Sequence, residues 1–329
     1  MQKKYYFILI IVLAVSISAG FVFAKIEKDS DKDGLSDTEE QKVYQTNPNK
    51  ADTDSDNFKD ADEVYHGYSP LAGGQAKLNQ VNLDIPYINE APDDNWTGPW
   101  KNACEEASLA MVEKYYTGVK QVTIKEAKTF MMAMFSKQNK IWGSNADADA
   151  DRMAKLINDY TSYNALIKDN PTIEQIVKEL QQKRPVIAPV FGFDLHNKNI
   201  PFLAPPRGTA YHMLVIGGYD DTTKEFITED SGDIVAGVNH RYTYDIVMGA
   251  LHDYNYATNR VDGPATAIFT YPKLVKLADS PKVYYLHDNI KQWVTDENIF
   301  KAKGWKWEAV NLVDQEWLDT FNSGADIKV

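Results

Sequence analysis

The sequence predicts an α+β fold, in which a helical part comes first and an antiparallel sheet follows. A helix is predicted from residue 104, where Ala107, Met111 and Tyr115 fall on one face at helical spacing. Residues 105–185 are predicted to be mostly helical. The apolar segments after Pro185 are short and bounded by turn residues, as expected for strands. They span 186–190, 210–220, 226–233 and 265–271.

Smaller signals support individual elements. Pro171-Thr172 is a start signal for a helix over 173–180. The segment 210–220 reads as a buried strand that ends in a Gly-Gly turn, and it forms a hairpin-like pair with 226–233. The segment 81–87 alternates like a strand that opens the domain, and a helix after Tyr242 reaches Leu251.

Length and charge limit the classes of function. A chain of 329 residues has room for one large domain and smaller modules. The net charge of -12 argues against nucleic acid as a partner. Residues 27–63 hold 13 acidic residues and 5 lysines, so 13 - 5 gives an excess of 8 negative charges there. The division that we predict is 1–24, 27–66, a linker at 67–80, a main domain at 81–275, and a C-terminal module at 279–329.

The N-terminal stretch has the pattern of an export signal. Lys3 and Lys4 precede an apolar run from Tyr5 to Ala24. The run is close to the roughly 20 residues that span a bilayer, so the signal is either cleaved or retained as a membrane anchor. We therefore expect an exported protein, secreted or anchored at the cell surface, with the membrane as a partner in the second case.

Residues 29–40 fit a calcium loop of the form D-x-D-x-D-G-x5-E. Gly34 gives the sharp turn at position 6, and Leu35 offers its backbone carbonyl at position 7. The other ligands are carboxylates, which suit a hard cation that takes six to eight oxygens. These carboxylates are Asp29, Asp31, Asp33, Asp37 and Glu40.

The calcium pattern recurs 23 residues later, with Phe58 at the carbonyl position. Asn57 replaces the glycine, and asparagine tolerates the left-handed conformation better than most residues. The repeated carboxylates are Asp52, Asp54, Asp56, Asp60 and Glu63. An acidic disordered linker is the alternative, which two copies in register disfavour. The loops, with Thr46-Asn47-Pro48 between them, resemble thrombospondin type 3 repeats, which implies a stalk or spacer with structural calcium.

Cys104 is the sole cysteine, so the chain forms no intramolecular disulfide. Either it is a buried inert residue, or it is reactive. A position at the start of a helix favours a thiolate, which is the nucleophile of cysteine hydrolases. Glu105 and Glu106 beside it would raise the pKa of the thiol. A basic partner is therefore required.

His212 is the best candidate for that partner among six histidines, because it stands at the head of a buried strand. An imidazole there can take the thiol proton, and a carboxylate on its far nitrogen would fix the tautomer. Asp230 ends the neighbouring strand and is best placed for this, with Asp233 as the second choice. A histidine of the core is the alternative. The remaining histidines are His66, His196, His240, His252 and His287.

The order of cysteine, histidine and aspartate resembles the papain-like fold and, more narrowly, the bacterial C39-like peptidase family. The matching motifs are Cys-x-x-Ala-Ser at Cys104, His-x-x-x-Val-x-Gly-Gly-Tyr-Asp at His212, and Asp230 before Ser-Gly. The resemblance covers about residues 81–272. It implies that the three residues act as nucleophile, general base and orienting acid.

Two positions depart from the family pattern. The family often has Cys-Gly, where this chain has Cys104-Glu105. The family also has a glutamine as oxyanion-hole donor, where this chain has Glu90 in a Pro-Tyr-Ile-x-Glu phrase, and an ionised carboxylate cannot donate. Gly98, six residues before the cysteine, offers no side chain. The backbone N–H of Cys104 or the amide of Asn102 could fill the hole.

Two functions follow from these observations. The first is an exported cysteine peptidase or amidase that acts on a peptide or on cell-wall peptide. The second is a catalytically inactive C39-like domain in a surface binding or adhesion protein, in which the calcium stalk and the C-terminal module dominate. That module is similar to short modules of bacterial surface proteins, and we expect its aromatic residues to form its own core. The sequence does not set the oligomeric state.

Overall fold

The fold is described from a computed structural model, in which residues 27–200, 210–233 and 235–328 are placed. The α+β prediction is confirmed. The main sheet has the strand order β2-β7-β3-β4-β5-β6, and β1 pairs with the far end of β4. All of these pairings are antiparallel. The strands are β1 (Gln80–Asn82), β2 (Tyr163–Asp169), β3 (Val186–Phe191), β4 (Tyr211–Asp220), β5 (Glu225–Glu229), β6 (His240–Thr243) and β7 (Thr266–Pro272).

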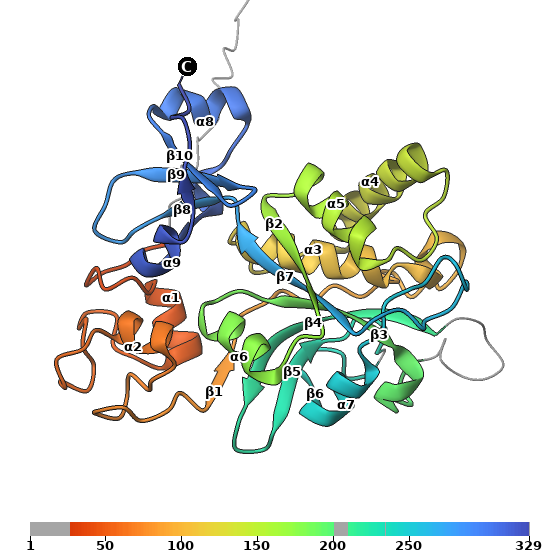
Figure 1. The fold of residues 1–329 in the computed structure, drawn as a ribbon, viewed down its shortest axis with the longest axis horizontal. Coiled ribbons are helices and arrows are strands. Elements are labelled where there is room, and N and C mark those ends of the chain that lie inside the picture. The colour runs from red at the N-terminus through yellow and green to blue at the C-terminus, as the bar shows by residue number, and fades with distance from the viewer. Residues whose placement is uncertain (1–26, 201–209, 234, 329) are drawn as a thin grey trace, which may run out of the picture.

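Helices cover both faces of this sheet (Figure 1). Three of them gather on one side, and α3 packs directly against β4. These are α3 (Cys104–Tyr116), α4 (Ile124–Trp142) and α5 (Ala150–Tyr160). On the opposite side lie α6 (Ile173–Gln181) and α7 (Tyr244–Ala250). The predicted start of α6 is confirmed, because Thr172 caps it reciprocally with Gln175.

The expectation of mostly helical structure over 105–185 is wrong for one segment. Residues 163–169 form strand β2, which pairs along its whole length with β7, from Tyr163 opposite Pro272 to Asp169 opposite Thr266. Its position at the sheet edge explains why the sequence does not reveal it. Leu166 is 60% exposed there, so the segment lacks the apolar run of a central strand.

The Gly-Gly turn predicted at the end of the histidine strand is also wrong. β4 continues through Gly217 and Gly218 to Asp220, with an irregular register to β5 at this point. The glycines serve close packing, because a Cβ atom on Gly218 would lie 2.4 Å from the carbonyl oxygen of Val81 in β1. The turn itself comes after Asp220.

A second sheet, with strand order β11-β8-β9-β10-β12, belongs to the C-terminal part of the chain. Aromatic rings pack within it, with Phe300 stacked on Trp307 and Tyr285 on Trp305. The elements are β8 (Leu274–Lys276), β9 (Val283–His287), β10 (Ile290–Val294), α8 (Glu297–Lys303), β11 (Val310–Leu312), α9 (Gln315–Asp319) and β12 (Asn322–Ser323).

The acidic segment packs onto the main domain. It contains α1 (Asp37–Glu39) and α2 (Asp60–His66), and its apolar residues Leu35, Tyr44 and Val64 belong to the same buried cluster as the core of the main sheet. Ion pairs join the two parts at Lys42–Asp84, with 2.9 Å between Nζ and Oδ2, and at Lys183–Glu39, with 3.1 Å between Nζ and Oε1. The acidic segment is therefore a docked part of the fold.

The export signal expected at 1–24 lies outside the described residues. None of the helices in the described part of the chain has both the length and the apolar character needed to span a bilayer.

Candidate active site

Cys104 is the first residue of α3, as predicted, and its side chain points to the main sheet. The α3 face that holds it packs against β4, so the cysteine is only 4% exposed. The thiol donates a hydrogen bond to Oε2 of Glu105 at 3.1 Å. The nucleophile candidate thus lies inside the protein, against the strand that carries the histidine.

His212 is the second residue of β4, and Asp230 directly follows β5. Val215 pairs with Glu229, so Asp230 lies one step beyond this pair, diagonally across from His212 on the same face. The two side chains meet there, with 2.8 Å between Nε2 and Oδ1, and both are fully buried. Since Nε2 faces the carboxylate, Nδ1 is the nitrogen that is left to face other groups.

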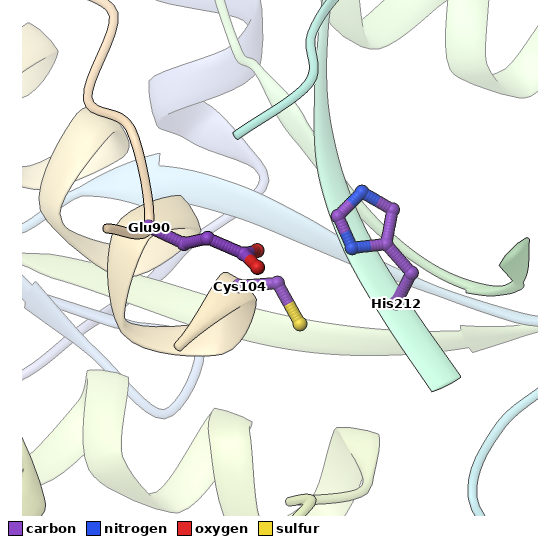
Figure 2. Close-up of side chains that lie close together, drawn as sticks. All are labelled: Glu90, Cys104 and His212. Atoms are coloured by element: carbon purple, nitrogen blue, oxygen red, sulfur yellow. The ribbon is translucent and has the colours of Figure 1, made fainter. Parts of the chain in front are cut away.

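Three side chains from separate segments converge beside this pair. One potential ligand atom from each of Glu90, Cys104 and His212 lies within 4.8 Å of the other two, and all three residues are buried. Figure 2 shows the Glu90 carboxyl group and the imidazole ring approaching each other from opposite sides above the sulfur. The structure therefore brings together the cysteine, histidine and aspartate that the sequence singled out, and it adds Glu90.

The other predicted choices lie elsewhere. Asp233, the second choice for the orienting acid, lies 3.1 Å from Nδ1 of His240 and also accepts from Asn197. His252 follows the end of α7, and its Nδ1 lies 3.2 Å from the carbonyl oxygen of Gly263. Neither histidine belongs to the buried cluster at Cys104.

Burial and neighbouring carboxylates determine the charges of the cluster. Burial, followed by the charges of Glu105 and Glu90, raises the pKa of the Cys104 thiol well above its ordinary value. Burial lowers the pKa of His212, but the charge and the hydrogen bond of Asp230 outweigh this, and the net shift is upward. The resting pair is therefore a neutral thiol beside a readily protonated imidazole, and the thiolate favoured by the helix start alone is not the resting form.

Asp230 remains ionised despite its burial. Burial raises its pKa, while the charge of His212 and hydrogen bonds from His212, Tyr242 and Gly232 lower it, with a net downward shift. The hydroxyl of Tyr242 donates to Oδ2 at 2.7 Å. The sequence offered no local sign of this contact, because Tyr242 reaches the site only through the pairing of β6 with β5.

The segment 87–90 is tied to the turn that follows Asp230. The Tyr87 hydroxyl donates to the carbonyl oxygens of Asp230 at 3.3 Å and of Asp233 at 3.4 Å. The Glu90 backbone N–H donates to the carbonyl oxygen of Ser231 at 3.2 Å, and the Ser231 hydroxyl donates to Oε2 of Glu90 at 3.3 Å. These contacts fix Glu90 in place from the same turn that positions Asp230.

The two acidic loops have matching internal geometry. In each, the first aspartate accepts backbone N–H groups three and five residues ahead, at 2.7 and 3.3 Å for Asp29 and at 2.7 and 3.0 Å for Asp52. Gly34 and Asn57 both have positive φ, of 116° and 80°, which confirms the expected left-handed asparagine. The aspartates at the first, third and fifth positions converge within 4.8 Å in each loop.

Each loop holds buried carboxylate oxygens that have no hydrogen-bond partner among the described residues. These are Asp31 Oδ2, Glu40 Oε2, Asp54 Oδ2 and both side-chain oxygens of Glu63. Such orphaned charge is costly unless an ion compensates it, and an all-oxygen donor set suits calcium. The residues present therefore fit the predicted ion.

Two of the expected ligands have a different contact. Asp37 accepts hydrogen bonds from the backbone N–H and the hydroxyl of Ser30, at 2.8 and 2.9 Å. Asp60 accepts the equivalent pair from Thr53, at 2.7 Å each. Both aspartates therefore brace the beginning of their loop. Leu35 and Phe58 can contribute only their backbone carbonyl oxygens, as expected.

Comparison with known proteins places the main domain. Residues 82–261 match the model of the family described as Peptidase_C39 like family. A solved structure assigned as a C39-like peptidase, from Bacillus anthracis, is similar at 16% identity with a TM-score of 0.38, over 58% of this chain and 97% of that one. No curated protein matches the chain.

Proposed function

The chain belongs to the Peptidase_C39 like family, whose match spans more than half of its residues, and from this premise we propose that it is a cysteine hydrolase of papain-like fold that cleaves a peptide-like bond. The observation that carries the proposal is the convergence of Cys104 and His212 at one buried point, with Asp230 hydrogen-bonded to the far side of the ring. A nucleophile, a base and a group that orients the base are the parts that such a reaction needs.

The charges of the site suggest how the first step runs. Because the pKa of the thiol is raised, His212 would act as a general base that accepts the proton while the sulfur attacks the carbonyl carbon. Asp230 accepts a hydrogen bond from Nε2, which leaves Nδ1 for the proton of the sulfur. The imidazolium then returns this proton to the leaving amine, and water hydrolyses the thioester.

The substrate class that we propose is a peptide, either free or as part of the cell wall. The N-terminal stretch with Lys3, Lys4 and the apolar run to Ala24 supports export, so such a substrate would lie outside the cytoplasm. Fractionation of cells that express the full chain tests this part, since a cytoplasmic location would contradict it.

We also propose that both acidic loops bind calcium in a structural role. The matching loop geometry and the unpartnered oxygens of Glu40 and Glu63 support this. Calcium would neutralise the carboxylates and stiffen a segment that packs on the main domain through Leu35 and Tyr44. A spacer role toward the N-terminus stays a prediction.

Alkylation of the single cysteine tests the hydrolase proposal. Iodoacetamide labelling of Cys104 is followed by mass spectrometry across pH, for the wild type and for His212→Ala, with circular dichroism as the check on folding. We expect slow labelling at neutral pH that becomes slower still in the variant, because the base is lost. Equal rates for the two proteins would contradict a Cys–His pair. Metal content is measured in parallel, because an ion held by Glu90, Cys104 and His212 would also slow the labelling of the thiol.

A catalytically inactive binding domain is the second candidate. It is favoured by Glu105, whose hydrogen bond and charge hold the thiol in its protonated form. In that case Cys104 would label at the same rate with or without His212.

A further inference from the structure

The Glu90 carboxyl group is the one member of the buried cluster that the proposed mechanism does not use. Its side chain is completely buried, and a carboxylate oxygen lies within 4.8 Å of the ligand atoms of Cys104 and His212. Oε2 accepts a hydrogen bond from Ser231, while Oε1 has no hydrogen-bond partner in the part of the chain that the structure describes. A buried polar atom without a partner calls for an explanation, and a role that begins when substrate binds is one.

We propose that Glu90, in its neutral acid form, donates a hydrogen bond from its carboxyl O–H to the carbonyl oxygen of the substrate while Cys104 attacks. The inference rests on the proposed hydrolase function and adds a catalytic residue to it. Glu90 would then supply the donor that a glutamine supplies in the resemblance described above. Glutamate in place of glutamine at position 90 would still stabilise the oxyanion, but only at a pH where its carboxyl group is protonated.

The step balances without any further reactant. The sulfur of Cys104 bonds to the carbonyl carbon, the π electron pair moves onto the oxygen, and the thiol proton passes to His212. The Glu90 proton stays on Glu90 and is only shared with the developing oxyanion. When the intermediate collapses, the electron pair returns, the carbon–nitrogen bond breaks, and the amine leaves with the proton from His212.

The geometry permits this contact. The substrate oxygen is attached to the carbon that bonds to the sulfur, so it lies within two bonds of Sγ. A carboxyl oxygen less than 5 Å from Sγ can then reach hydrogen-bonding distance of it. Figure 2 shows the Glu90 carboxyl group above the sulfur, across from the imidazole ring.

The surroundings keep the proton on Glu90. Burial raises the pKa of Glu90, and the charge of protonated His212 lowers it. The negative charges of Asp230 and Glu105 raise it further, so that the pKa is about 8. At neutral pH most molecules therefore carry an acid that can donate, and above pH 8 most carry a carboxylate that would repel an oxyanion. The groups on the elements packed around Glu90 are Cys104, Glu105, Glu106, His212, Asp230 and Ser231.

Two reactions of the Cys104 sulfur distinguish a donor to the oxyanion from a residue that only changes the reactivity of the thiol. Iodoacetamide alkylates Cys104 by displacing iodide from a CH2 group, so no oxyanion forms. p-Nitrophenyl acetate acylates Cys104 through a tetrahedral intermediate that needs the donor. Because both reactions use the same sulfur and the same base, the ratio of acylation to alkylation largely cancels changes in the reactivity of the thiol and reports on oxyanion stabilisation.

The variants are Glu90→Gln, which keeps a donor at every pH, and Glu90→Ala, which removes it. We expect the ratio to stay near the wild-type value in Glu90→Gln and to fall about 100-fold in Glu90→Ala. The wild-type ratio should also fall as pH rises through about 8, while that of Glu90→Gln stays level. Circular dichroism confirms that each variant is folded.

Two results would overturn the inference. One is a wild-type ratio in Glu90→Ala, and the other is a Glu90→Gln ratio as low as that of Glu90→Ala. Failure of the hydrolase proposal looks different. There, alkylation is insensitive to His212→Ala, whatever the ratio shows for Glu90.

Discussion

His212 and Asp230 form a fully buried pair, with 2.8 Å between Nε2 and Oδ1. The pair exists because β4 and β5 are neighbours in the sheet and place the two side chains on one face. The charge of Asp230 keeps the pKa of His212 above its ordinary value, against the effect of burial. In the proposed mechanism the carboxylate would both hold the ring and stabilise the imidazolium that forms when the thiol proton is transferred.

Asp230→Asn is expected to slow acylation of Cys104 by p-nitrophenyl acetate by about 100-fold or more. The amide would fill the same space, but it carries no charge and can stabilise the wrong tautomer of His212. Asp233→Asn is the matched control. Asp233 follows the same strand yet contacts His240, so its variant should acylate at close to the wild-type rate. Equal losses in both variants would mean that the turn is disrupted in general.

Tyr242→Phe tests the second contact of the aspartate. The variant removes the 2.7 Å hydrogen bond to Asp230 Oδ2 and leaves the packing of the ring in place. A hydrogen bond to a charged group contributes about 1.5–3 kcal/mol, so we expect stability to fall by up to that amount and the pKa of Asp230 to rise. Guanidinium denaturation measures the first. A stability unchanged within error would contradict the prediction, because the hydrogen bond would then make no net contribution.

The sequence was sufficient for the catalytic candidates because each lies at the end of an element with a strong local pattern. Cys104 opens an apolar helix, His212 heads a run of buried β residues, and Asp230 closes the next run. Pairing of β4 with β5 follows from their short connection in the chain. Local pattern and near-neighbour pairing therefore placed these three residues at the site.

The remaining features depend on contacts between distant segments. The Glu90 carboxyl is buried by a turn that lies 141 residues away at Ser231, so its protonated state could not be predicted from its own neighbourhood. β2 cannot be recognised from its own residues because it is an edge strand, and Gly218 resembles a turn residue because the strand that requires it, β1, lies far back in the chain. The sequence shows no local sign of either pairing.

Glu105→Gln is expected to make Cys104 more reactive at neutral pH. The carboxyl group accepts the thiol hydrogen bond, and its charge helps to raise the pKa of the thiol. A glutamine can still accept from the backbone N–H of Ala148 while its NH2 group donates to the sulfur. A lower thiol pKa leaves more thiolate at pH 7, which predicts iodoacetamide labelling that is faster by roughly an order of magnitude.

Glu106→Gln is the control for this variant. Glu106 is also buried in α3, but it contacts Gln138 and not the sulfur. Labelling should respond much less to this change. If both variants accelerate labelling equally, the effect reflects the overall charge of the helix start, and the direct contact of Glu105 with Cys104 has no special part in it.

Calcium is expected to stabilise the protein through the two acidic loops. At a concentration 100 times the dissociation constant, one site contributes about 2.7 kcal/mol, which raises the melting temperature by roughly 5 °C or more in a chain of this size. Glu40→Gln and Glu63→Gln should each reduce this rise. Asp62→Asn, on the exposed side of α2, should leave it unchanged. Scanning calorimetry with calcium and with chelator makes the comparison, and no calcium-dependent shift in the wild type would contradict the proposed sites.

Gly237→Ala is expected to damage the site through the backbone. The Gly237 carbonyl oxygen accepts the N–H of Asp230 at 2.9 Å, and a Cβ atom would lie 2.2 Å from the Asp230 carbonyl oxygen and 2.7 Å from the Tyr87 hydroxyl. Relieving these clashes should cost about 1–3 kcal/mol of stability and should move the segment that orients His212. We therefore expect a lower melting temperature together with slower acylation of Cys104.

Gly249→Ala is the matched control for that change, because a Cβ atom there meets nothing within 4 Å and the residue lies in α7. Alanine favours a helix over glycine by up to about 1 kcal/mol, so this variant should be as stable as the wild type or slightly more so. Its acylation rate should be unchanged. If Gly237→Ala were as stable and as active as Gly249→Ala, the close contact at Asp230 would not hold the aspartate in place, and the hydrogen bonds of its carboxylate to His212, Tyr242 and Gly232 would have to do so.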